Sequence, residues 1–161
     1  LKSMGKVAIL DIDYHHGNGT QDIFWDDPDV LFVSIHADPT QDYPRYTGFS
    51  HEIGGDSALG RNINYPLPHG TDAETYLNTL DDALHQIQTF QPATLVVSLG
   101  FDTYKDEPMG HFRLDIPHFE TIGSHIAALG YPTLYVQEGG YAIDALGVLG
   151  VSFFSGVLER R

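Results

Sequence analysis

The sequence predicts an α/β protein with a parallel sheet that is covered by helices on both faces. Four short apolar runs, at residues 7–13, 30–36, 94–100 and 133–137, have the composition of strands buried on both sides. Amphipathic helical segments separate most of these runs, and strands that alternate with such segments form parallel sheets. Residues 1–161 are long enough for a single domain with a real core. Ligands of such folds bind beyond the carboxyl ends of the strands.

Each predicted helix has its own boundary signals. Thr20 opens a short helix over residues 20–25, and Thr71 or Asp72 caps a long one that ends near residue 90. Pro117, a residue favoured in the first helical turn, begins a helix to about residue 129, and a closing helix covers residues 142–158. Residues 37–68 are rich in Gly, Pro, Asp and Tyr and show no periodicity, which predicts a long irregular stretch in an ordered, wall-forming loop.

Composition excludes several classes of function. The formal net charge of −14 argues against nucleic acid as a partner and suits a cationic substrate. The chain has no cysteine, so disulfides and thiol nucleophiles are excluded, and any metal must be bound by His, Asp and Glu. No run of about 18 apolar residues predicts a membrane span, and no signal peptide is recognisable, so a cytoplasmic location is the default expectation.

A metal site is predicted where the first strand ends. Asp11, Asp13 and His15 alternate, so their side chains point to the same side of an extended chain. Asp102 follows the third apolar run, so it should reach the same rim of the sheet. Asp13, His15 and Asp102 would leave a fourth coordination position open, as in catalytic zinc sites. Tyr141 follows two glycines and could donate to a developing oxyanion, so the set predicts metal-assisted hydrolysis of an amide.

Each of these residues also has a structural interpretation. Alone, Asp102 would more often form a turn, and Tyr141 would more often contribute packing. His16 should point away from His15, into the core or against a ligand. Asp11 lies inside the strand and therefore needs a partner such as a monovalent cation or a histidine. The alternation of acids and imidazoles raises the whole set above these separate interpretations.

Three motifs resemble those of the histone deacetylase and acetylpolyamine amidohydrolase family. Residues 11–21 (DIDYHHGNGTQ) resemble its zinc-site signature, in the form seen on the class II side. Residues 98–103 (SLGFDT) resemble the segment of the third ligand, and residues 138–141 (EGGY) resemble the motif of the catalytic tyrosine. The stretch from His36 to Pro44 looks closer to acetylpolyamine amidohydrolases than to histone deacetylases.

The resemblance implies a fold, an activity and a set of roles. The fold is an arginase-deacetylase-like three-layer sandwich with a central parallel sheet, incomplete in this chain. The activity is zinc-dependent removal of acetyl or other acyl groups from acetylated polyamines or similar small amines. The implied residues are Asp13, His15 and Asp102 for Zn²⁺, Tyr141 for catalysis, Asp11 and Ser34 for a structural K⁺, and Tyr43, Met109 and Gly140 for substrate. A second K⁺ near Phe24, Asp27 and Val30 is a weaker expectation.

One departure from the family pattern limits these expectations. The family has a Gly-His-His segment before the first motif, which supplies an acid-base pair, and nothing in this chain matches it. We therefore expect the chain to be the carboxyl-terminal part of a deacetylase domain whose upstream half is missing. An uncovered face would then favour a homo-oligomer or another association. Three alternatives stay open: a protein-lysine deacetylase, a non-catalytic metal-binding half-domain, and an arginase-like enzyme with two Mn²⁺.

Overall fold

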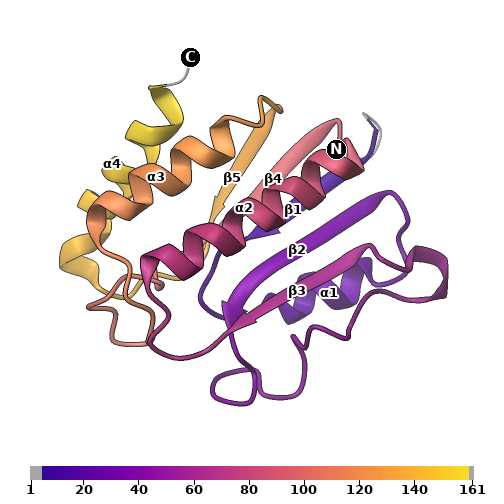
Figure 1. The fold of residues 1–161 in the computed structure, drawn as a ribbon, viewed down its shortest axis with the longest axis horizontal. Helices are drawn as coiled ribbons and strands as arrows, with labels where there is room; N and C mark the ends of the chain where they lie inside the picture. Colours follow the sequence, from indigo (N-terminus) through magenta and orange to yellow (C-terminus); the bar gives the residue numbers. More distant parts are fainter. Residues whose placement is uncertain (1–4, 160–161) are drawn as a thin grey trace.

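The computed structural model describes residues 5–159 and is built on one five-stranded sheet (Figure 1). The strand order is β3-β2-β1-β4-β5, and every neighbouring pair is parallel. The strands are β1 (Val7–Asp11), β2 (Val30–Ala37), β3 (Asn62–Leu67), β4 (Thr94–Leu99) and β5 (Thr133–Gln137). The helices are α1 (Asn18–Phe24), the 3₁₀ turn η2 (Asp56–Ala58), α2 (Ala73–Phe90), α3 (Ile116–Ala127) and α4 (Ile143–Leu158). The predicted α/β class with a parallel sheet is confirmed.

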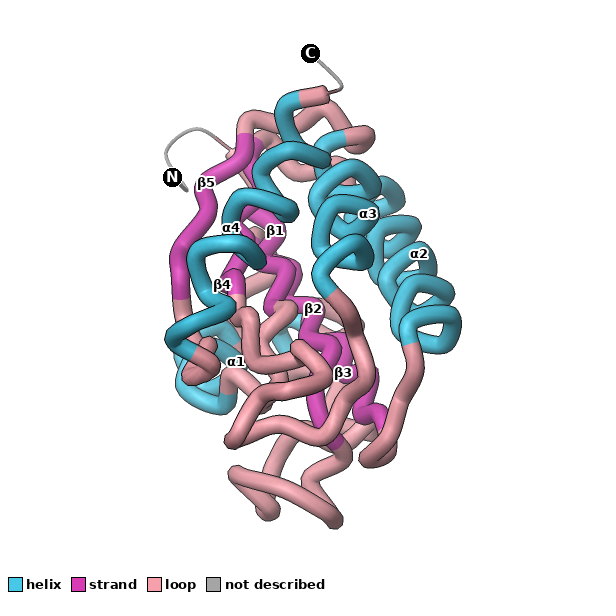
Figure 2. The backbone as a smooth tube through the Cα atoms, turned by 90° about the vertical axis from the view of Figure 1, so that its left-hand side faces the viewer, coloured by secondary structure: helices cyan, strands magenta, loops and turns pink. Residues whose placement is uncertain are grey.

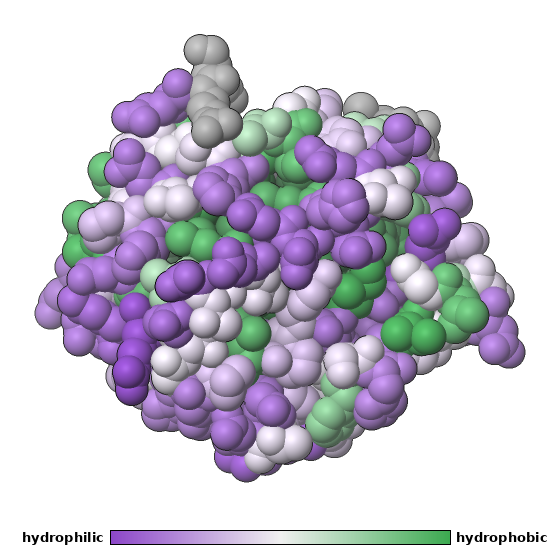
Figure 3. Space-filling view, viewed as in Figure 1, coloured by the Kyte–Doolittle hydropathy of each residue, from purple (hydrophilic) through white to green (hydrophobic). Residues whose placement is uncertain are grey.

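Helices cover the two faces of the sheet unequally. Helices α2, α3 and α4 lie on one face and the short α1 on the other (Figures 1 and 2). The main core fills the space under the three helices, with Leu10, Leu80 and Phe153 among its buried side chains. A much smaller core lies on the α1 face and contains Val7, Ile9, Val30 and Phe32. The side of α2, α3 and α4 presents mostly hydrophilic side chains, with apolar groups between them (Figure 3).

The helix boundaries follow the capping residues. The side chain of Asp72 accepts a hydrogen bond from the Thr75 amide at 2.9 Å, which confirms Asp72 as the N-cap of α2. Helix α3 begins with a capping box between Asp115 and His118, with Pro117 in its first turn. Helix α1 begins at Asn18 rather than at Thr20, because the turn after the first motif is already helical.

The prediction of a fully irregular stretch over residues 37–68 was wrong in its last part, which forms β3 and η2. The β3 sequence NINYPL lacks an apolar run and contains a proline, so its pattern does not indicate a strand. Pro66 is tolerated because β3 lies at the edge of the sheet. Asn62 and Asn64 are buried because both donate to the side-chain oxygen of Gln21 in α1, at 2.9 and 2.8 Å.

The connections between strands create a switch point beside β1. The chain runs from β1 to β2 and β3 on one side, and α2 then carries it back to β4 on the other side of β1. Crevices at the carboxyl ends of such neighbouring strands are where open α/β sheets bind ligands. The segments that follow β1 and β4 therefore meet at this place. No helix within residues 5–159 has both the length and the apolarity that a membrane span requires.

Candidate metal centre

Asp13, His15 and Asp102 come together at the switch point. One possible ligand atom from each of the three side chains lies within 4.8 Å of the other two. His15 Nδ1 is 3.1 Å from Asp102 Oδ2 and 3.5 Å from Asp13 Oδ1. Both carboxylates are buried, and His15 is only partly exposed. The structure thus brings together the three residues that the sequence proposed as zinc ligands, and their binding of zinc stays a prediction.

Backbone amides fix the orientation of both carboxylates. Asp102 Oδ1 accepts from the Tyr14 amide at 2.9 Å, and Asp13 Oδ1 accepts from the His15 amide at 2.8 Å. Asp13 Oδ2 accepts from the Gly139 amide at 2.7 Å. These amides orient the two carboxylates, and hydrogen bonds of this kind to metal ligands raise the affinity of a metal site.

The electrostatics of the three residues favour a cation between the carboxylates. Burial, together with repulsion from Asp13, raises the pKa of Asp102 above its ordinary value. Burial opposes protonation of His15, but its hydrogen bonds to Asp102 and Asp13 outweigh burial and raise its pKa to about 10. A second carboxylate beside the first therefore needs a positive charge, which a proton on the imidazole or a metal ion can supply. The donor set of two carboxylates and one imidazole fits a Zn²⁺ ion.

Asp11, the last residue of β1, is buried among acidic groups, and such an environment suits a monovalent cation. Burial, followed by repulsion from Asp13, raises its pKa well above the ordinary value, and the next charges are those of Glu138 and Asp102. In the sheet register Asp11 lies opposite Ser34. The Ser34 hydroxyl bonds to His36 Nδ1 at 2.8 Å, and His36 Nε2 bonds to the Gly48 carbonyl at 2.8 Å. The imidazole must therefore donate to Gly48 and accept from Ser34, which leaves the Ser34 oxygen free to contact a cation.

His16 lines the same cavity as Asp13 and His15, and its predicted orientation away from His15 stays a prediction. Its ring is buried 4.5 Å from that of His36, and its Nε2 is 3.1 Å from the side-chain oxygen of Gln21. The segment of the second expected K⁺ forms a tight turn, in which the Asp27 amide donates to Phe24 and the Val30 amide donates to Asp27. Nothing in this turn tests K⁺ binding, which stays a prediction.

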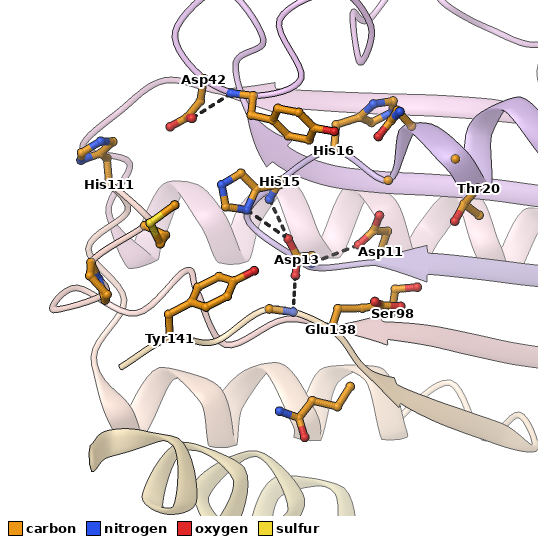
Figure 4. Close-up of a pocket in the computed structure, with 18 residues that line it drawn as sticks. Asp11, Asp13, His15, His16, Thr20, Asp42, Ser98, His111, Glu138 and Tyr141 are labelled. Carbon is orange, nitrogen blue, oxygen red and sulfur yellow. Dashed lines mark hydrogen bonds and ion pairs between the residues drawn. The ribbon is translucent and has the colours of Figure 1, made fainter. Parts of the chain in front are cut away.

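The turn after β5 brings Tyr141 to the centre. A Cβ atom on Gly139 would lie 2.3 Å from Asp102 Oδ2, so only glycine allows this close approach. Gly140 has φ +140° and redirects the chain. The Tyr141 ring then extends toward Asp13 and His15 (Figure 4). Slight burial, followed by the charges of Asp102 and Asp13, raises the pKa of Tyr141, so its phenol keeps its proton at neutral pH.

An open cavity of about 910 Å³ gives access to these groups. Tyr43 and Met109, expected to contact substrate, line it together with His15 and Tyr141, whereas Gly140 acts through the turn and does not line it. The acids Asp11, Asp13, Asp42 and Glu138 also line the cavity. A cavity with this excess of acidic groups favours a positively charged ligand.

Glu107 holds the backbone of the Tyr141 turn, although no sequence motif singles it out. Its buried carboxylate accepts from the amides of Tyr141 at 3.0 Å and Ala142 at 3.1 Å, and also from the Met109 amide at 3.4 Å. It thereby fastens the Tyr141 turn to the loop that carries Met109. The sequence signal was weak, because Glu107 stands in the segment between β4 and α3 and belongs to no motif.

Comparisons with known proteins show the family of this chain. Residues 1–156 match the histone deacetylase domain family, and the chain belongs to this family. It is 51% identical to acetylpolyamine amidohydrolase 1 of Pseudomonas aeruginosa over 151 residues, which are 94% of this chain and 44% of that protein. It is 42% identical to the acetylpolyamine amidohydrolase of Mycoplana ramosa, covering 97% of this chain and 46% of that protein.

Solved structures show the same architecture. The crystal structure of acetylpolyamine aminohydrolase from Burkholderia pseudomallei matches with a TM-score of 0.94 and 46% identity, over 95% of this chain and 45% of that one. A histone deacetylase homologue from Aquifex aeolicus matches with a TM-score of 0.87 and 27% identity, over 96% of this chain and 43% of that one. The expected deacetylase-type fold is therefore confirmed, and the chain spans less than half the length of these relatives.

Proposed function

We propose that this chain carries the metal- and substrate-activating part of a zinc-dependent amidohydrolase. The observation that carries the proposal is the convergence of Asp13, His15 and the fully buried Asp102 beside a cavity that Asp13, His15 and Tyr141 line. Zn²⁺ held by these three residues would polarise the amide carbonyl and acidify a water molecule. The residues of the chain would do the rest: they orient the ligands, keep them desolvated and place a phenol beside the reacting carbonyl.

Tyr141 would act as the donor to the developing oxyanion. Its phenol is protonated at neutral pH, as an ordinary tyrosine is, and slight burial followed by the charges of Asp102 and Asp13 raises its pKa further. An oriented donor that strengthens its hydrogen bond in the transition state contributes about 10²–10³ in kcat. Glu107 accepts hydrogen bonds from the amides of Tyr141 and Ala142 and so fixes the backbone from which the Tyr141 ring extends.

An acetylated polyamine or a similar small acyl-amine is the proposed substrate. The acidic cavity and the net charge of −14 favour a cationic molecule. Relatives at 51% and 49% identity are named acetylpolyamine amidohydrolases, which supports the same substrate class for the protein that contains this chain. A protein-lysine deacetylase is the alternative, supported by the family description and by the similarity to the histone deacetylase homologue.

Asp11 and Ser34 are the proposed ligands of a structural K⁺. A buried carboxylate whose nearest charges are other acids is stabilised by a cation that needs no proton. The K⁺ would support the loop of residues 11–15, which presents two of the zinc ligands.

The test measures bound metal and amide hydrolysis together. Zinc content and turnover of acetylspermidine and of an acetyl-lysine peptide are compared for the 161-residue chain, Tyr141→Phe and the control Tyr131→Phe, which lies against the main core. The proposal is supported if the chain binds one zinc with high affinity and hydrolyses acetylspermidine faster than the peptide. Tyr141→Phe should lose this turnover, and Tyr131→Phe should keep it. A large preference for the peptide overturns the choice of substrate. Zinc binding without any turnover supports a non-catalytic role for the isolated chain, and two Mn²⁺ in place of zinc supports an arginase-like enzyme.

A further inference from the structure

A second group of metal-type side chains lies outside the centre described above. Asp42, His69 and His111 each place one possible ligand atom within 4.8 Å of the other two. The His69 and His111 rings are 4.3 Å apart between centroids and are tilted by 43°. His69 Nε2 is 3.2 Å from Asp42 Oδ2. The three residues follow β2, β3 and β4 respectively, so they share the end of the sheet where ligands bind.

Backbone hydrogen bonds hold these three segments together independently of the imidazole rings. The Gly70 amide donates to the His111 carbonyl at 2.7 Å, and the Arg113 amide donates to the Thr71 carbonyl at 2.9 Å. The loop of Asp42 is tied in by the Asp38 amide, which donates to the Leu67 carbonyl at 2.8 Å. The His69 amide also donates to the side chain of Gln41 at 2.8 Å. The donor set is therefore preorganised, which lowers the cost of binding an ion.

The carboxylate of this group has the support typical of a metal ligand. Asp42 Oδ2 accepts from the phenol of the fully buried Tyr14 at 2.9 Å, and Oδ1 accepts from the Tyr43 amide at 2.8 Å. Partial burial opposes ionisation, but these hydrogen bonds outweigh it and lower the pKa of Asp42. The carboxylate is thus ionised and oriented before any ion arrives, as expected of a ligand with an outer partner.

The two groups share no residue, although Tyr14 touches both. Its amide donates to Asp102 in the first centre, and its phenol donates to Asp42 in the second group. Asp42 and His111 line the same cavity as Asp13 and lie at a distance from it (Figure 4). His69 and His111 are exposed, so an ion could enter from solvent without passing the first centre.

We propose that Asp42, His69 and His111 form a second divalent-metal site at the cavity entrance. Two imidazoles and one carboxylate suit Cu²⁺ and Zn²⁺ among the available ions. Solvent exposure makes this site the weaker and more readily exchanged of the two. A bound dication would add positive charge at the entrance and repel a cationic amine. This last consequence depends on the proposed function, whereas the binding of metal does not.

The test is a calorimetric titration of the chelator-treated chain with Zn²⁺, repeated with Cu²⁺. The variants are His69→Gln with His111→Gln, Asp42→Asn, Asp102→Asn for the first centre, and the control His85→Gln, an exposed histidine of α2. We expect two equivalents of metal for the wild type and for His85→Gln. Removing the two imidazoles should abolish the weaker equivalent, and Asp42→Asn should weaken it at least about tenfold.

Asp102→Asn separates the two proposals. It should remove the tighter equivalent and leave the weaker one intact. Two results would show that the second site does not exist. In one, the wild type binds a single equivalent, and the double variant His69→Gln/His111→Gln binds it equally well. In the other, the double variant still binds two equivalents. If the only equivalent is lost in the double variant and kept in Asp102→Asn, the second site stands and the zinc centre of the proposed function fails. Circular dichroism melting of each variant identifies any loss caused by misfolding.

Discussion

At the scale of single residues, the proposed chemistry depends on how closely the backbone approaches two buried carboxylates. Asp13 and Asp102 receive three amide hydrogen bonds, one of them from Gly139 in the turn after β5. That turn can come so near only because Gly139 has no side chain. Gly139 of the EGGY motif therefore contacts the proposed metal ligands as well as preceding the tyrosine turn.

Gly139→Ala should damage the metal centre. The new Cβ would lie 2.3 Å from Asp102 Oδ2 and 2.6 Å from Asp13 Oδ2, so the ligands would have to move. Overpacking of this kind costs about 1–3 kcal/mol, and we expect zinc affinity to fall about tenfold or more. Gly147→Ala in α4, where a Cβ meets nothing within 4 Å, should keep zinc affinity and stabilise the fold slightly. Equal zinc affinity in Gly139→Ala and wild type, measured by competition with a chelating dye, would contradict the expectation.

Glu107→Gln should reduce turnover without reducing zinc affinity. Glu107 contacts the backbone of Tyr141 and Ala142 and no proposed zinc ligand, so it positions the phenol alone. Weakening the hydrogen bonds of a buried carboxylate costs about 1.5–3 kcal/mol. If this cost appears as a misplaced Tyr141 phenol, kcat should fall roughly tenfold to a hundredfold. The matched control is Glu74→Gln, an exposed glutamate of α2. Measured kcat and KM should show the loss mainly in kcat, and a parallel fall in zinc content would instead assign Glu107 to the metal centre.

At the scale of elements, the loop of residues 47–52 is joined to the short helix α1 by side-chain hydrogen bonds. Residues 47–52 are held by Glu52, which accepts from Gln21, Thr47 and the Gly48 amide at 2.8–2.9 Å. Gln21 in turn accepts from Asn62 and Asn64 of the edge strand β3. One polar network thus joins α1, the loop and β3 behind the metal centre.

The stability contribution of Glu52 should depend on pH. Partial burial opposes its ionisation, but hydrogen bonds from Gln21, Gly48 and Thr47 outweigh burial and lower its pKa from the ordinary value of 4.5. A carboxyl group with a lowered folded-state pKa contributes stability above pH 4.5 and loses it as pH falls through the folded value.

Glu52→Gln should therefore be less stable than wild type by about 1 kcal/mol at pH 7, a figure reduced for solvent screening. The difference between the two proteins should shrink below pH 4.5, where the unfolded wild type takes up its proton. Urea unfolding at a series of pH values measures both. If the gap between wild type and Glu52→Gln were the same at pH 3.5 and pH 7, the carboxylate would not be the cause; Glu74→Gln serves as the control for general charge effects.

At the scale of the whole molecule, the region of β5 and α4 carries apolar surface that no other described element covers. Leu134 and Val136 of β5 are partly exposed, and Val151 and Phe154 of α4 are exposed as well. A groove of about 580 Å³ lies between these elements, lined mainly by apolar side chains. Strand β5 is also an edge strand of the sheet that residues 5–159 form.

This surface should cause the isolated chain to associate with a second copy of itself. Exposed apolar patches next to an open edge strand favour association. We expect a concentration-dependent increase in mass by sedimentation velocity, and Val151→Glu, at a side chain that is 68% exposed, should weaken it. Gln88→Glu on the exposed side of α2 adds the same charge elsewhere and should not. Association of equal strength in wild type and Val151→Glu would show that α4 does not take part.

The sequence alone predicted most of the elements and selected the three residues proposed as zinc ligands. Apolar runs and capping residues located four of the five strands and all four α-helices, because burial and capping leave local patterns. Alternation after the first strand selected Asp13 and His15. The end of the third apolar run selected Asp102, and the two preceding glycines selected Tyr141, before the family motifs added to both choices. The grouping of the three ligands agrees with those selections.

Only the tertiary structure decided the remaining features, because each depends on residues far apart in the chain. Strand β3 is stabilised by pairing with β2 and by contacts to Gln21, so its own sequence carries no strand pattern. Glu107 acquires its role from amides more than thirty positions away. Asp42, His69 and His111 become neighbours only when the loops after three strands meet at one rim. Local sequence patterns record burial and backbone preference, whereas the approach of distant side chains is set by strand order and register.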